Sequence, residues 1–244
     1  MIGLIGSGNM AWALARGWEE PVLATDAGSG RARKLVEEVG GEALESNAEL
    51  AERADVVVLC HKPYQLEQVA AEAGPHAKRV ISVLGGTTLE QLRGAYPKAE
   101  VVVRALPNTP AEVRKGVTCL AEGDGTELAR ELFGRVGDVV VLPERLMGVA
   151  GATMGTSPAY VALLVEAHVD AAIKHGLTAE VASVLAVQAL EGAAALIRHR
   201  GDDTLAVRRG VTSPGGTTAR GLAALEAHGV RTAMMAAMDE VMDR

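Results

Sequence analysis

The chain is poor in aromatic residues: Phe, Tyr and Trp together make up 2% of its 244 positions. A core with so few rings must be filled mainly by Ala, Val, Leu and Ile. Hydrophobic residues make up 48% and charged residues 23%, a balance typical of a soluble globular protein with a real core. The length allows one large domain or two modest ones.

Three further absences exclude classes of protein. Asp and Glu (31) outnumber Lys and Arg (24), and no basic run interleaved with aromatics occurs, which argues against nucleic-acid binding. No run of uninterrupted apolar residues approaches about 18, the length expected of a membrane span, and the chain begins with a strand-like run and not with a basic segment followed by an apolar one. The two cysteines, Cys60 and Cys119, are too few for a disulfide framework and lack metal-ligand spacing. We therefore expect a soluble, cytoplasmic protein with no bound metal, no membrane contact and no nucleic-acid partner.

Residues 1–142 alternate between short apolar, β-branched runs and helical patterns. The expected strands are Met1–Ile5, Val22–Thr25, Val56–Cys60, Arg79–Val83, Val101–Leu106, Val117–Ala121 and Val139–Leu142. The expected helices are Asn9–Trp18, Arg31–Val39, Ala48–Arg53, Gln65–Ala73, Leu89–Ala95 and Thr126–Val136. Near-continuous apolar runs favour strands buried on both faces of a parallel sheet. This alternation predicts a doubly wound α/β domain of the Rossmann-like, dinucleotide-binding type.

Residues 143–244 show helical periodicity and no strand signal, so we expect an all-α domain. The predicted helices are Ala159–His175, Ala179–Arg200, Gly215–Glu226 and Arg231–Asp243. Several are apolar around much of their circumference, Val181–Leu190 for example, and such helices must bury against something. A partner subunit is the economical answer, and a compact helical core is the alternative.

A glycine-rich loop joins the first predicted strand to the first helix. It reads Gly6-Ser7-Gly8-Asn9-Met10-Ala11, a G-x-G-x-x-A pattern. The first glycine permits the tight turn, the second lets the backbone approach a pyrophosphate, and the alanine keeps helix and strand close. Free amides at the helix N-terminus favour phosphate. The pattern predicts an NAD(P)H site.

Asp26 ends the second predicted strand, where an acidic side chain commonly accepts hydrogen bonds from the adenosine ribose. The alternative is a simple turn residue. Arg31 and Arg33 follow closely and could instead hold a 2′-phosphate. Because the Asp26 carboxylate would repel that phosphate, we expect NADH to serve at least as well as NADPH.

A second loop, Val211-Thr-Ser-Pro-Gly-Gly-Thr-Thr218, leads into a predicted helix in the second half. Exposed amides at that helix start, flanked by hydroxyl groups, would suit a small carboxylate. An ordinary capped helix start explains the same residues equally well.

At this point the sequence resembles the pyrroline-5-carboxylate reductase family. The matching segments are Gly6–Ala11, Lys62-Pro63, Arg104-Ala-Leu-Pro-Asn-Thr-Pro110, Ser157-Pro-Ala-Tyr160, and the loop from Val211 with its Gly221-Leu-x-x-Leu-Glu226 tail. The resemblance implies reduction of 1-pyrroline-5-carboxylate to proline, with hydride from NADPH or NADH. It also implies a homodimer with interlocking C-terminal helices, often assembled into a decamer of five dimers.

The resemblance also implies site residues. Ser213, Gly216 and Thr217 would hold the substrate carboxylate, and the Thr218 hydroxyl would bond the ring nitrogen as the catalytic contact. The implied cofactor contacts outside the glycine loop are Lys62, Pro63, Leu84, Gly85 and Asn108, and Glu144 would lie near the substrate. Two departures are His61, where a small apolar residue is common, and Met154-Gly-Thr-Ser-Pro-Ala-Tyr160 in place of Ser-Gly-Ser-Gly-Pro-Ala-Tyr. We include His61 among the candidate cofactor contacts.

This chemistry needs few reactive side chains, because a protonated imine is itself electron-poor and the protein mainly positions two ligands. Two rival functions fit the same patterns: a reductase of another cyclic imine or imino acid, and a dinucleotide-binding regulatory protein without turnover. His168 and His175 lie two helical turns apart with no fixed carboxylate, so we interpret them as surface or interface residues.

Overall fold

The structure is a computed structural model that describes residues 1–243, and it divides into two compact units, Met1–Thr156 and Ser157 onward. The sequence-based boundary lies earlier, between residues 142 and 143. The segment between the two boundaries holds a short turn of helix, Glu144–Leu146, and helix α7, Met147–Gly155. Met147 and Met154 of α7 are buried with Leu89 and Cys119, which explains why α7 belongs to the first unit.

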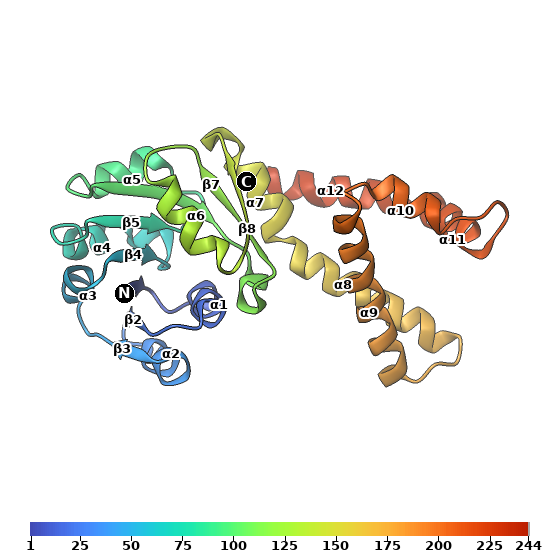
Figure 1. Cartoon of the computed structure of the whole chain (residues 1–244), viewed down its shortest axis with the longest axis horizontal. Helices are drawn as coiled ribbons and strands as arrows, with labels where there is room; N and C mark the ends of the chain where they lie inside the picture. The colour runs from blue at the N-terminus through green and yellow to red at the C-terminus, as the bar shows by residue number, and fades with distance from the viewer. Residues whose placement is uncertain (244) are drawn as a thin grey trace. The chain divides into compact units, whose positions relative to one another are not determined.

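The first unit is built on one eight-stranded sheet, shown in Figure 1, with the strand order β3-β2-β1-β4-β5-β6-β7-β8. The strands are β1 Ile2–Ile5, β2 Val22–Thr25, β3 Gly41–Ala43, β4 Val56–Leu59, β5 Arg79–Ser82, β6 Val101–Leu106, β7 Gly116–Ala121 and β8 Gly137–Leu142. All neighbouring strands are parallel except β6 and β7, which are antiparallel. The predicted Rossmann-like α/β class is confirmed, while β3 was not predicted because three residues carry no apolar pattern.

Helices cover both faces of this sheet. They are α1 Asn9–Trp18, α2 Arg31–Val39, α3 Asn47–Arg53, α4 Leu66–Ala73, α5 Leu89–Ala95 and α6 Thr126–Gly134. Side chains of α1, α2 and α6, including Leu14, Leu35 and Phe133, are buried in one core cluster with the strands. Side chains of α3, α4 and α5 form the cluster on the other face, including Leu50 and Leu92. The doubly wound arrangement follows from strands that are apolar on both faces.

The register of the sheet places four strand ends side by side. Ile5 of β1 pairs with Thr25 of β2 and with Leu59 of β4, and Leu59 in turn pairs with Ser82 of β5. The residues that follow these strands therefore meet along one edge. The chain reverses its direction of winding between β1 and β4, and open α/β sheets bind ligands at such a switch point.

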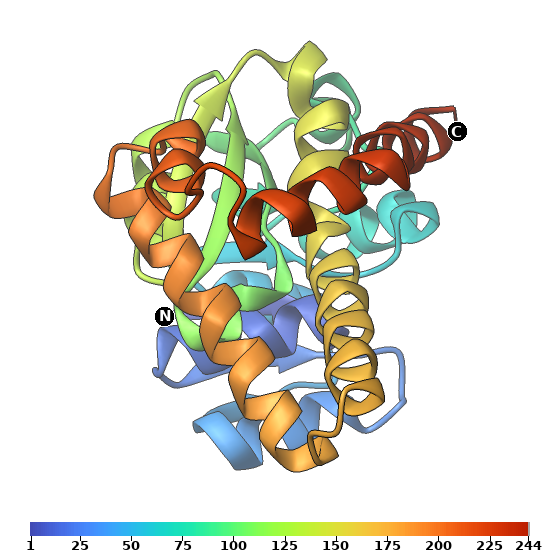
Figure 2. The ribbon, with the colours of Figure 1, turned by 90° about the vertical axis from the view of Figure 1, so that its right-hand side faces the viewer.

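The second unit is entirely helical over its described residues, as predicted. Its helices are α8 Ser157–Lys174, α9 Ala179–His199, α10 Thr204–Gly210, α11 Thr217–Ala227 and α12 Val230–Met242. Helices α8 and α9 pack against each other, and Figure 2 shows them as a long hairpin. Helix α10 was not predicted, and α11 begins later than expected because Gly215 adopts a positive φ of 69°.

Much of the apolar surface of this unit is exposed in the single chain. Val184, Leu185 and Val187 of α9 are 65%, 55% and 53% exposed, and Ala182 and Ala186 are the buried residues of that helix. Two segments, Glu144–Lys174 and Ala179–His199, are long and apolar enough to cross a membrane by length and composition alone. The same exposure is what a subunit interface requires before its partner is present.

Candidate active site

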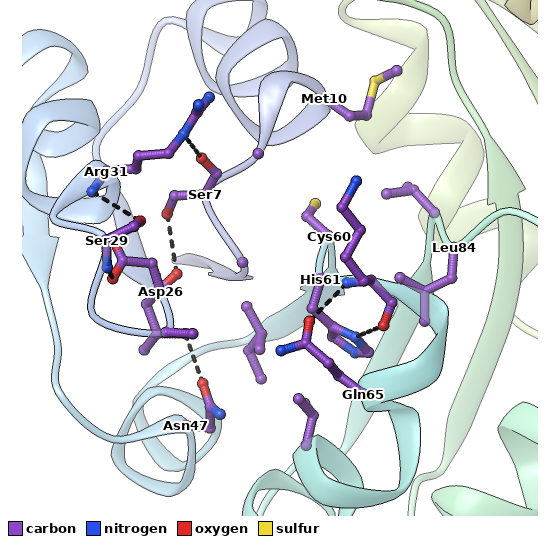
Figure 3. Close-up of a pocket in the computed structure, with 18 of the residues that line it drawn as sticks. Ser7, Met10, Asp26, Ser29, Arg31, Asn47, Cys60, His61, Gln65 and Leu84 are labelled. Atoms are coloured by element: carbon purple, nitrogen blue, oxygen red, sulfur yellow. Dashed lines mark hydrogen bonds between the residues drawn. The ribbon is translucent and has the colours of Figure 1, made fainter.

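The ends of β1, β2, β4 and β5 border an open cavity of about 810 Å³, which falls in the range of small-molecule and cofactor sites. Figure 3 shows side chains from several elements turned toward it. Most of the predicted cofactor residues line this one cavity: Gly6, Ser7, Gly8, Asn9, Met10, Asp26, His61, Lys62, Pro63, Leu84 and Gly85. The structure thus brings them together, and their individual roles stay predictions.

The glycine loop has the geometry that its sequence pattern predicts. Gly6 has a φ of 96°, and a Cβ there would lie 2.6 Å from the backbone nitrogen of His61, so only glycine fits. Gly8 is the N-cap of α1 and offers no side-chain cap, which leaves the first amides of the helix for an outside acceptor. Ala11 is fully buried in the core and not in the cavity lining, in keeping with a helix–strand spacer.

The end of β1 is tied to the end of β2. The Gly6 amide donates to the Thr25 carbonyl oxygen at 3.1 Å, and the Ser7 hydroxyl donates to the same oxygen at 3.0 Å. Arg31 reaches across from α2, where its Nε donates to the Ser7 carbonyl at 2.7 Å and its Nη2 to Asn9 Oδ1 at 2.9 Å (Figure 3). These bonds hold the loop in its anion-binding conformation.

The Asp26 carboxylate is directed into its own turn. Its Oδ1 accepts from the amides of Gly28 and Ser29 at 2.7 and 2.9 Å, and its Oδ2 accepts from the Ala32 amide at 2.7 Å. Partial burial acts to raise the pKa of Asp26, but these backbone bonds outweigh it and lower the pKa, so the group is ionised at neutral pH. The structure therefore favours the turn role, in which Asp26 shapes the loop that borders the cavity, over the predicted role as a free ribose acceptor.

His61 and Cys60 follow β4 at the bottom of the cavity. His61 Nδ1 lies 2.9 Å from the Lys62 carbonyl oxygen, which makes Nδ1 the protonated nitrogen of a neutral ring. Burial lowers the pKa of His61 more than this contact raises it. Burial also raises the pKa of the Cys60 thiol to about 12, so Cys60 is no nucleophile.

Besides Ala11, two predicted site residues of the first unit lie outside the lining of the cavity. Asn108 is buried: its Nδ2 donates to the Met154 carbonyl at 3.2 Å, and its Oδ1 accepts from the Val117 amide at 2.9 Å. It joins a short 3₁₀ turn, Thr109–Val113, to β7 and α7. Its neighbour Thr109 lines the cavity instead.

Glu144 is the second. Its Oε1 accepts from the Leu89 amide at 2.6 Å and from Arg104 Nη1 at 2.9 Å, and the Arg104 side chain is 9% exposed. Partial burial acts to raise the pKa of Glu144, but the Leu89 and Arg104 contacts overcome it and lower the pKa. Within the described chain Glu144 is thus the counter-ion of a buried arginine, a role for which its sequence context gave no signal.

The sequence also missed polar residues that line the cavity. Asn47 begins α3, Gln65 precedes α4, and Gln68 and Glu72 lie on α4. No motif contains them, because they come from separate elements that only the sheet brings together. Their combined character, three carboxamides beside one carboxylate, could therefore not be predicted from the sequence.

The predicted substrate residues form a loop in the second unit. The Gly216 amide donates to the Ser213 carbonyl oxygen at 3.1 Å, and a Cβ on Gly216 would lie 2.4 Å from the Ser213 hydroxyl oxygen. Gly216 is the N-cap of α11 without a side-chain cap, so the amides of Thr217 and Thr218 have no helical acceptor. Ser213, Thr217 and Thr218 are exposed. This loop is an uncapped helix start with hydroxyl groups around it.

Comparisons with known proteins agree on one family. The family described as pyrroline-5-carboxylate reductase dimerisation matches residues 144–244, and the one described as NADP oxidoreductase, coenzyme F420-dependent, matches residues 1–86. A pyrroline-5-carboxylate reductase of Synechocystis is 35% identical over 97% of this chain and 94% of its own length.

Two solved structures extend this likeness. The pyrroline-5-carboxylate reductase of Coxiella burnetii superposes with a TM-score of 0.87 at 33% identity, covering 100% of this chain and 96% of that one. The pyrroline carboxylate reductase of Plasmodium falciparum, solved with NADP bound, gives a TM-score of 0.86 at 26% identity over 99% and 95% of the two chains. With both sequence and fold matched from end to end, the chain belongs to the pyrroline-5-carboxylate reductase family.

Proposed function

We propose that the chain reduces 1-pyrroline-5-carboxylate to L-proline with hydride from NADH or NADPH. The observation that carries the proposal is the uncapped, hydroxyl-lined start of α11 in a chain that also holds a dinucleotide-type cavity. A redox sensor without turnover has no use for a carboxylate cradle. The regulatory alternative therefore has nothing in the structure to favour it.

The residues of the cavity fit a dinucleotide. Backbone amides at the start of α1 offer donors to a pyrophosphate, and the absence of side chains at Gly6 and Gly8 lets it approach. Asp26 and Ser29 would lie at the adenosine ribose, with Lys62, Leu84 and Gly85 further along the cavity. When bound, the nicotinamide supplies the hydride.

The start of α11 would hold the substrate by its carboxylate. The Gly216 amide, a predicted contact, already donates to the Ser213 carbonyl oxygen, so the remaining donors are the Thr217 amide and the Ser213 hydroxyl. The helix dipole adds positive potential at the same place. The Thr218 hydroxyl, one residue further along α11, would accept a hydrogen bond from the N–H of the protonated ring nitrogen. These contacts fix the distance between the carboxylate and the imine and so orient the carbon that receives hydride.

The protonated imine needs no further acid from the protein. Hydride adds to the carbon of the C=N bond, the π electrons of that bond move to nitrogen, and nitrogen keeps the proton it carried. The resulting amine then takes a second proton from water. The neutral His61 and the protonated Cys60 thiol are consistent with a site that positions ligands and carries out no acid–base step.

The direct test is an assay of NADH and NADPH oxidation with 1-pyrroline-5-carboxylate, with proline identified as the product. We expect turnover that depends on both ligands. Parallel reactions with piperideine carboxylate separate the rival: a higher kcat/KM on the six-membered imine would assign the chain to another cyclic imine. Absence of turnover on either imine would overturn the proposal.

The dimerisation domain supports a homo-oligomer, and we propose a dimer in which the exposed apolar faces of α8 and α9 are covered by the partner. The same burial would make the membrane-length helices subunit contacts in a cytoplasmic enzyme. A decamer of five dimers remains an expectation from the family resemblance. Light scattering tests the dimer, and a stable, active 25.3 kDa monomer at micromolar concentration would contradict it.

A further inference from the structure

One side of the cavity carries a polar network that the proposed chemistry does not use. Asn47 lies opposite Met10 and Leu84 in Figure 3, on the side lined by α3 and α4. If the pyrophosphate lies at the glycine loop and the adenosine ribose at the end of β2, the base of the dinucleotide extends toward this side. The inference drawn here therefore rests on the proposed function and concerns how the same cavity chooses its nucleotide.

Hydrogen bonds fix the orientation of this network. The Thr25 hydroxyl donates to Asn47 Oδ1 at 2.7 Å, so the amide nitrogen of Asn47 faces the other way. That nitrogen donates to Glu72 Oε2 at 2.7 Å, and Gln68 Nε2 lies 3.5 Å from Glu72 Oε1. A carboxylate can only accept hydrogen bonds, so the network of hydrogen bonds ends at Glu72, whose carboxylate still has lone pairs available at the cavity wall.

Gln65 offers a hydrogen-bond donor to the cavity, whereas Glu72 offers an acceptor. Its Oε1 accepts from the Lys62 amide at 3.0 Å, which leaves its Nε2 as a donor. Figure 3 shows this nitrogen turned toward the side of the cavity where Asn47 lies. Between the two polar groups the lining includes the apolar side chain of Val69. An acceptor, a donor and an apolar surface on one wall match the edge and face of a purine.

We propose that Glu72 selects adenine by accepting a hydrogen bond from its exocyclic amino group, with Gln65 donating to a ring nitrogen. Adenine offers an amino donor and a ring-nitrogen acceptor along one edge, the pair that Asn and Gln side chains read in nucleic acids, and a carboxylate accepts from an exocyclic amino group of cytosine in the same way. Hypoxanthine carries a carbonyl oxygen in place of the amino group, and the Glu72 carboxylate repels that oxygen. Glu72 is thus a specificity-determining residue for the base, and Asn47 holds it in place.

The test compares NADH with reduced nicotinamide hypoxanthine dinucleotide, whose base carries a carbonyl oxygen in place of the exocyclic amino group and a hydrogen on the neighbouring ring nitrogen. Binding is followed by the nicotinamide fluorescence of each dinucleotide on the full chain, and kcat/KM is measured alongside. We expect wild type to bind NADH about tenfold more tightly, the size of one hydrogen bond to a charged group.

Glu72→Gln is the informative variant. Its amide oxygen would face Asn47 Nδ2, which leaves its NH₂ toward the base, where it suits the hypoxanthine carbonyl. We expect the preference for NADH to fall to about one or to reverse. Glu67→Gln is the matched control, because Glu67 lies on the same helix, is exposed and does not line the cavity. It should keep the wild-type ratio.

Equal binding of both dinucleotides by wild type, or an unchanged ratio in Glu72→Gln, would overturn the inference. Failure of the proposed function gives a different pattern: no oxidation with any imine, while the binding ratio still reports on Glu72. A chain that binds neither dinucleotide would overturn both.

Discussion

Replacing Thr218 with alanine tests the proposed contact to the ring nitrogen. The Thr218 side chain is exposed, and it forms no hydrogen bond that caps α11 within the described chain. Alanine is also the better helix former, by about 0.5 kcal/mol. The substitution should therefore not lower the stability of the fold, and any loss of activity has to come from the lost substrate contact.

The magnitude follows from one hydrogen bond to a charged group. Such a bond contributes about 1.5–3 kcal/mol, which is roughly a 10- to 150-fold loss in kcat/KM. Both kcat and kcat/KM should fall, because the orientation that the bond imposes on the imine contributes more in the transition state than in the bound ground state. The affinity for NADH, measured by fluorescence titration, should stay nearly unchanged.

Two neighbouring variants serve as controls. Thr217→Ala removes an equally exposed hydroxyl from the same helical turn but keeps the amide that is proposed to bind the carboxylate, so activity should be retained. Ser213→Ala removes one of several carboxylate donors and should mainly raise KM. Full activity of Thr218→Ala on 1-pyrroline-5-carboxylate would reduce the loop to an ordinary helix start, and the substrate site would have to lie elsewhere.

Three further outcomes are expected. Glu144→Gln removes the counter-ion of the buried Arg104 and should lower the free energy of unfolding by about 2–3 kcal/mol at pH 7. Because the pKa of Glu144 is lowered in the folded protein, this difference between wild type and variant should persist down to about pH 5. It should vanish at lower pH, where the carboxyl is protonated, and chemical denaturation over a pH series measures it. Gly6→Ala forces a Cβ against backbone atoms and should weaken NADH binding at least about tenfold, whereas Gly28→Ala, with the same sign of φ but open space, should bring only the backbone strain of about 1–2 kcal/mol. NADH should match or exceed NADPH in kcat/KM, because we propose that ionised Asp26 lies at the ribose end of the cofactor site, where it would repel a 2′-phosphate. A tenfold advantage for NADPH in steady-state assays would show that nearby arginines outweigh this repulsion.

The fold was predictable where one short segment decides its own structure. The strands β1 and β4 are short, fully buried apolar runs that carry no helical periodicity, and the glycine loop follows β1 directly. Gly6 and Ala11 behave as their positions in the motif require, because a tight turn and a close helix–strand contact are local demands. The placement of the loop at the edge of the sheet follows from the same few residues.

The candidate site was less predictable where a side chain finds its partner across the fold. The position of Asp26 at the end of β2 predicts a ribose acceptor or a simple turn residue, and only the path of the next six residues, which places three amides on its carboxylate, favours the turn role. Glu144 lies far along the chain from Arg104 and Leu89, and only the packing of α7 and α5 on the sheet joins them. Glu72 and Asn47 meet for the same reason.

The helical unit exposes apolar side chains that one chain alone cannot bury. Three α9 side chains, Val184, Leu185 and Val187, are each more than half exposed, and burying one such side chain fully contributes about 1.5–3 kcal/mol. A single helical hairpin that leaves these side chains in water forgoes a hydrophobic contribution comparable to the whole free energy of unfolding of a small domain. In the proposed dimer, folding of this unit and association with a partner would therefore be coupled, as in obligate dimers. Because the Ser213–Thr218 loop belongs to the same unit, the order of the proposed substrate cradle depends on that association as well.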